Sequence, residues 1–61
     1  MFTLKNALDA LAKDGINKAG DLLEAAESLA KDRFSTDEPT NEQIDSCAAQ
    51  ALVKILAENQ K

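Results

Sequence analysis

Apolar residues recur every three or four positions in three successive segments of this chain. That spacing places them on one face of an α-helix, and no segment alternates apolar and polar residues as a half-buried strand does. The chain has 61 residues, which is enough for one small domain. We therefore expect an all-α fold with 1–61 as a single helical domain and helices over about 4–13, 18–34 and 41–58.

Polar residues and a glycine at the ends of these segments predict where each helix begins and stops. Thr3 and Asn17 are the expected N-caps of the first and second helices, because their side chains can accept from free first-turn N–H groups. Thr40 and Gln43 have the spacing of a capping box, which predicts the start of the third helix. Gly15 can adopt the left-handed conformation that ends a helix.

The predicted core is small because alanine makes up much of each apolar stripe. Burying a Leu or Ile contributes roughly 1.5–3 kcal/mol, whereas an alanine methyl contributes about as much as one CH₂. Ordering the chain costs on the order of 1.5 kcal/mol per residue, so an isolated monomer is marginal and we expect a homodimeric helical bundle. The stripes are Leu4, Ala7, Leu8, Leu11 and Ala12; Ala19, Leu22, Leu23, Ala26, Leu29, Ala30 and Phe34; and Ile44, Cys47, Ala48, Ala51, Leu52 and Ile55.

Charge and composition indicate which partners and compartments suit the chain. Eleven acidic against seven basic residues give a net charge of −4, which disfavours nucleic acid and anionic membranes as partners. No apolar run is long enough to span a bilayer, and the N-terminus lacks the pattern of a secretory signal. Cys47 is the single cysteine and is expected to be buried, and one unpaired thiol fits a reducing compartment. We expect a cytoplasmic protein.

The sequence offers little for catalysis or for metal and cofactor binding. It has no His, no cysteine cluster, no nucleophile motif and no glycine-rich phosphate loop. The acidic residues lack the alternating oxygen ligands and turn glycine of a calcium loop. We expect no enzymatic activity, no metal and no cofactor.

Two groups of residues are candidates for contact with a partner. Apolar residues off the main stripes form a candidate partner or dimer face, although scattered surface hydrophobes are also ordinary. Acidic residues around the start of the third helix form a candidate patch for a basic partner, although acids at a helix N-terminus also stabilise the helix itself. The apolar face is Phe2, Ala49, Val53 and Leu56, and the acidic patch is Asp37, Glu38, Glu42 and Asp45.

These features favour a small non-enzymatic interaction or regulatory protein that docks a helix face onto another protein, including a second copy. One alternative is an acidic decoy that occupies the site of a nucleic-acid-binding or defence protein. A second is a helix-turn-helix DNA-binding regulator, which the acidic polar side of the second helix disfavours. In size, acidity and alanine content the chain resembles small helical accessory proteins of phages and plasmids, with no residue-level correspondence.

Overall fold

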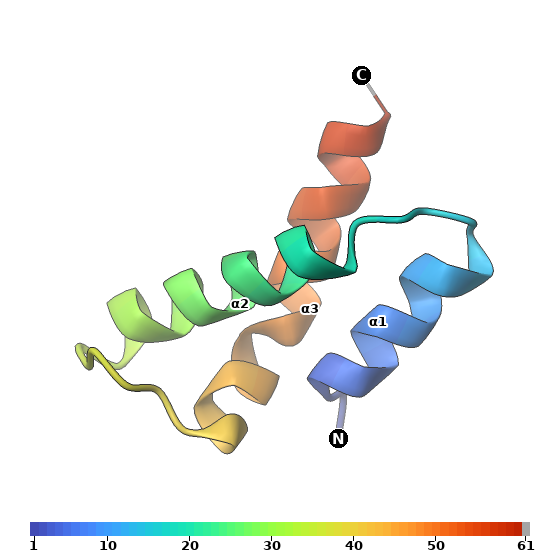
Figure 1. The fold of residues 1–61 in the computed structure, drawn as a ribbon. Helices are drawn as coiled ribbons and strands as arrows, with labels where there is room; N and C mark the ends of the chain where they lie inside the picture. Colours follow the sequence, from blue (N-terminus) through green and yellow to red (C-terminus); the bar gives the residue numbers. More distant parts are fainter. Residues whose placement is uncertain (61) are drawn as a thin grey trace.

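The computed structural model describes residues 1–60, which form three α-helices and no strand (Figure 1). They are α1 (Leu4–Lys13), α2 (Ala19–Arg33) and α3 (Asn41–Asn59). The prediction of an all-α, three-helix fold is confirmed. The bounds of α1 are as predicted, α2 begins one residue later and ends one residue earlier, and α3 continues one residue further.

Both α1 and α2 pack against α3. The contact between α2 and α3 is the most extensive, and α1 packs on both of these helices. In Figure 1, α2 crosses α3, α1 lies to one side of that crossing, and the two termini are at opposite ends of the view. The outer side of α3, away from α1 and α2, is therefore left without a covering helix.

The core consists of residues from the predicted stripes, and most of them are small. Leu11, Leu22 and Cys47 are the largest fully buried side chains. The prediction that Cys47 is buried is confirmed. The complete set of buried residues is Ala7, Leu11, Leu22, Ala26, Ala30, Cys47, Ala48, Ala51 and Ile55.

The predicted stripe of the second helix is too wide. Leu22 and Ala26 lie on the side of α2 that is buried against its neighbours, whereas Leu23 is 40% exposed and Phe34 is also exposed. Because successive residues differ by about 100° around a helix, Leu23 falls at the edge of the buried side. Phe34 follows the last residue of α2 and serves as its C-cap. Neither side chain is part of the buried core.

Side-chain caps begin two of the three helices. Thr3 Oγ1 accepts from the Asn6 N–H at 3.2 Å, and Asn6 Oδ1 accepts from the Thr3 N–H at 3.0 Å. The predicted capping box of Thr40 and Gln43 is present, with distances of 3.2 and 2.9 Å. The predicted cap at Asn17 is wrong. The N-cap of α2 is Lys18, which makes no capping side-chain hydrogen bond, because the helix starts one residue later than the pattern indicates.

The first two helices end in the same way. Gly15 adopts the predicted left-handed conformation with φ of +70°, and the Ile16 N–H donates to the Leu11 carbonyl at 2.9 Å. Ser35 occupies the equivalent position after α2 with φ of +50°, and the Thr36 N–H donates to the Lys31 carbonyl at 3.1 Å. This hydrogen bond from the second residue beyond the cap is the Schellman arrangement, for which glycine is the usual residue.

Candidate protein-docking surface

The side of α3 that faces away from the other helices carries uncharged side chains, most of them small. The buried residues of α3 lie on its other side, so the residues on this side are all exposed to solvent. Val53 is 65% exposed. We call this set the outer face of α3. It consists of Ser46, Ala49, Gln50, Val53 and Ala57.

A shallow hollow lies in the middle of the outer face of α3. Ala49, Gln50, Val53 and Lys54 line it, its volume is about 390 Å³, and its lining is almost entirely apolar. Val53 forms one wall of the hollow and also projects from the surface. The surface therefore presents an exposed apolar side chain at the edge of a shallow, nearly flat apolar depression.

The four residues of the predicted apolar face do not lie in one environment. Ala49 and Val53 share the outer face of α3. Leu56 is half-buried and packs against the core, so it supports the fold. Phe2 is 42% exposed. It precedes Leu4 by two residues, which keeps its Cα within about 7 Å of the start of α1.

The four acidic residues of the predicted patch are also separated by role. Asp37 and Glu38 are exposed on the loop before α3, and Glu42 is exposed in the first turn of α3. Asp45 is half-buried, and its Oδ1 accepts from the Leu4 N–H at 2.8 Å. This carboxylate caps the N-terminus of α1 from a neighbouring helix, where a negative charge is favourable.

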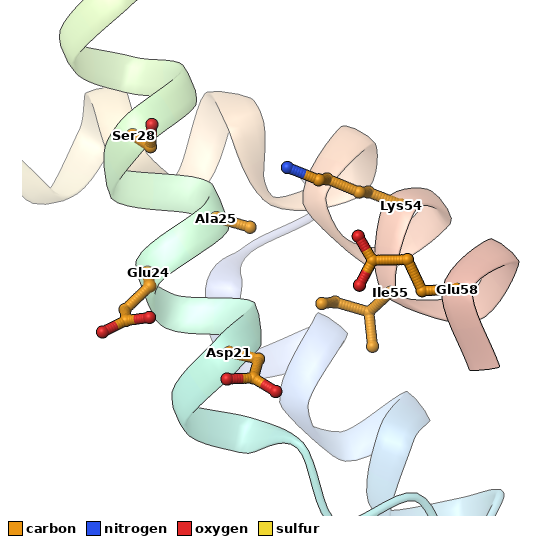
Figure 2. A pocket seen from close by; sticks show the side chains of 7 residues that line it. All are labelled: Asp21, Glu24, Ala25, Ser28, Lys54, Ile55 and Glu58. Atoms are coloured by element: carbon orange, nitrogen blue, oxygen red, sulfur yellow. The ribbon is translucent and has the colours of Figure 1, made fainter.

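A groove between α2 and α3 was not predicted from the sequence. It has a volume of about 260 Å³, and Ala25 and Ile55 are the apolar residues among those that line it. Figure 2 shows Lys54 and Glu58 extending from α3 toward α2, where Asp21 points toward α3 and Glu24 points away from it. The sequence pattern assigns these polar residues to two separate helices, and only the crossing of α2 and α3 brings them together.

The residues that the structure describes show neither the pattern of a metal site nor unpaired buried polar side-chain groups. Among residues 1–60, no group of three or more Cys, Asp or Glu side chains is arranged to hold a metal ion. In the same part of the chain, every buried side-chain nitrogen or oxygen has a hydrogen-bond partner. The outer face of α3 presents the apolar side chains of Ala49, Val53 and Ala57 to solvent, beside the polar Ser46 and Gln50.

Comparison with protein-family models, with curated proteins and with solved structures found no match to this chain. None of the helices α1, α2 and α3 has both the length and the apolar character needed to cross a membrane.

Proposed function

We propose that this chain is a small non-enzymatic interaction protein that docks the outer face of α3 against a helix of another protein. The observation that carries the proposal is the exposure of Val53 beside an apolar hollow lined by Ala49. A side chain placed in this way contributes nothing to the core of its own chain. It gains apolar contact only when another surface covers it.

The composition of the core supports this proposal. Few large side chains are buried, so the free energy of unfolding of the isolated chain is expected to be small. Covering an exposed Val contributes up to roughly 1.5–3 kcal/mol, which is large beside the net stability of a small domain. A homodimer is one form of this docking, because it adds buried apolar area to both chains at once.

The distribution of charge favours a protein as the partner. The groove between α2 and α3 is lined by three carboxylates and one ammonium group, and this excess of negative charge repels phosphate backbones. The charged residues are Asp21, Glu24, Glu58 and Lys54. This arrangement also weighs against the DNA-binding alternative, in which α2 enters a groove of DNA. The acidic decoy has less support, because Asp45 is committed to the Leu4 N–H inside the fold.

Photo-crosslinking from the outer face of α3 tests the proposal. A photoreactive amino acid replaces Val53 in one variant and the exposed Lys31 of α2 in a control. After irradiation in the cells that produce the protein, we expect protein adducts from position 53 and few from position 31. Equal yields from both positions, or no adduct from position 53, would contradict docking through this face.

A further inference from the structure

We infer that the partner of the outer face of α3 is the same face of a second copy, with the two α3 helices antiparallel about a two-fold axis. This inference rests on the proposed function and names its partner. It commits to one geometry, in which Val53 of each chain lies over Ala49 of the other.

The outer face of α3 can pair with itself. A two-fold interface uses the same patch on both subunits, so that patch must carry both a projection and its receptor. Val53 supplies the projection, and the hollow beside Ala49 supplies the receptor.

The size of the side chains allows the two helices to approach closely. Ser46, Ala49 and Ala57 flank Val53 along the outer face of α3 and do not extend far from the helix, whereas Gln50 is longer and has to turn aside at close approach. Helix axes approach to about 8 Å where the contacting residues are small. At that separation a side chain the size of Val reaches the facing backbone.

The distribution of charge favours pairing through the outer face of α3 and an antiparallel orientation of the two helices. The chain carries a net charge of −4, so two copies repel each other over most orientations. The outer face of α3 has no carboxylate between Ser46 and Ala57. Antiparallel pairing also sends the acidic residues Asp37, Glu38 and Glu42 of the two chains to opposite ends, and it opposes the two helix dipoles favourably.

The length of the outer face of α3 limits the area that a dimer can bury and therefore its affinity. From Ser46 to Ala57 the helix rises about 17 Å, so the contact buries less than the roughly 800 Å² per partner of a standard interface. We therefore expect a reversible dimer that dissociates at micromolar or higher concentration.

Sedimentation equilibrium of the full chain tests the choice of partner. We expect a monomer–dimer equilibrium, and we expect Val53→Asp to raise its dissociation constant about tenfold or more, since each dimer contains the substitution twice. Ser28→Asp adds the same charge at an exposed site on α2 and is expected to leave the constant nearly unchanged. Val53→Ala should also weaken the dimer, because it removes apolar contact. Alanine favours the helix, so this variant replaces Val53→Asp in the test if Val53→Asp does not fold.

Spin labels test the orientation. Cys47 is fully buried, so a label attached to Asn59→Cys reports on the end of α3. Antiparallel pairing about residue 51 places the two labels about 25 Å apart, whereas parallel pairing places them about 10 Å apart. The shorter distance overturns the proposed geometry.

The outcomes separate this inference from the function on which it rests. A chain that stays monomeric at about 1 mM, while position 53 still crosslinks to another protein in cells, overturns self-pairing and leaves helix-face docking in place. A dimer that is unaffected by both Val53 substitutions overturns self-pairing through this face. A monomer without crosslinks from position 53 overturns both proposals.

Discussion

Asp45 joins the third helix to the first. Its Oδ1 accepts from the Leu4 N–H at 2.8 Å, while the Thr3 side chain caps the Asn6 N–H of the same helix. Two of the free donors at the N-terminus of α1 are thus satisfied, one by a local side chain and one from 41 residues away. This single hydrogen bond fixes where α1 begins relative to α3.

Substitution of Asp45 tests this role. Asp45→Ala removes both the acceptor and the charge, so we expect the free energy of unfolding to fall by about 1–2 kcal/mol. Asp45→Asn keeps an acceptor and should lose less, because only the interaction of the charge with the helix dipole disappears. Urea denaturation followed by far-UV circular dichroism measures both changes. Asp37→Ala, on the exposed loop, is the control, and equal losses at positions 37 and 45 would contradict the interhelical cap.

At the scale of the helices, the ends of α1 and α2 differ by one residue type. Gly15 and Ser35 both have positive φ and both precede a hydrogen bond that closes the helix. The left-handed conformation is strained for any residue with a Cβ and unstrained for glycine. The end of α1 is therefore well adapted, whereas the end of α2 stores strain.

Exchanging these residue types should change stability in opposite directions. We expect Ser35→Gly to raise the free energy of unfolding by about 0.5–1 kcal/mol and Gly15→Ala to lower it by about 1 kcal/mol. Neither substitution removes a side chain from the core, so the helix content of the folded protein should not change. Chemical denaturation of the two variants beside the parent protein checks the signs. Two changes of the same sign would show that backbone strain does not control these helix ends.

How much of the fold the sequence predicts depends on how local each signal is. Thr40, Gln43 and Gly15 act within one turn of helix, and the structure has them in the predicted roles. The contact of Asp45 with Leu4 depends on the packing of α1 against α3, which no local pattern specifies. The left-handed Ser35 was missed because serine is not the residue that usually signals this conformation.

The candidate surfaces were also predictable only where the signal is local to one helix. Helical periodicity was sufficient to predict that Val53 and Ala49 share a side of α3 away from the buried stripe. It could not predict that Leu56 packs against the core, because that depends on where α1 and α2 lie. The groove between α2 and α3 is formed where these two helices cross, so it could not be inferred from either helix alone.

At the scale of the whole molecule, the fold exposes more surface than its size requires. Its accessible surface is 4251 Å², and a compact monomer of this mass exposes about 3,900 Å². The radius of gyration is 11.0 Å, against about 10.5 Å for a compact chain of this length. Together with an alanine-rich core, these values describe a fold that stands to gain from further burial.

The adjacent residues Leu22 and Leu23 provide a matched test of the core. Leu22 is fully buried, so we expect Leu22→Ala to cost about 2–5 kcal/mol and to abolish a cooperative melt near room temperature. Leu23 is 40% exposed, so the same substitution there should cost much less. Thermal denaturation followed by circular dichroism compares the two variants. Superimposable melting curves would show that the buried side of α2 has been assigned incorrectly.

The measurement that most directly tests the outer face of α3 as an association surface is the thermal midpoint as a function of protein concentration. At low concentration, Val53→Ala should melt above the parent, because alanine favours the helix more than an exposed valine by roughly 0.5 kcal/mol. As the concentration rises, the parent midpoint should increase and overtake that of the variant, because only the parent retains the full contact between copies. A parent midpoint that does not change with concentration, below that of Val53→Ala throughout, would contradict the account.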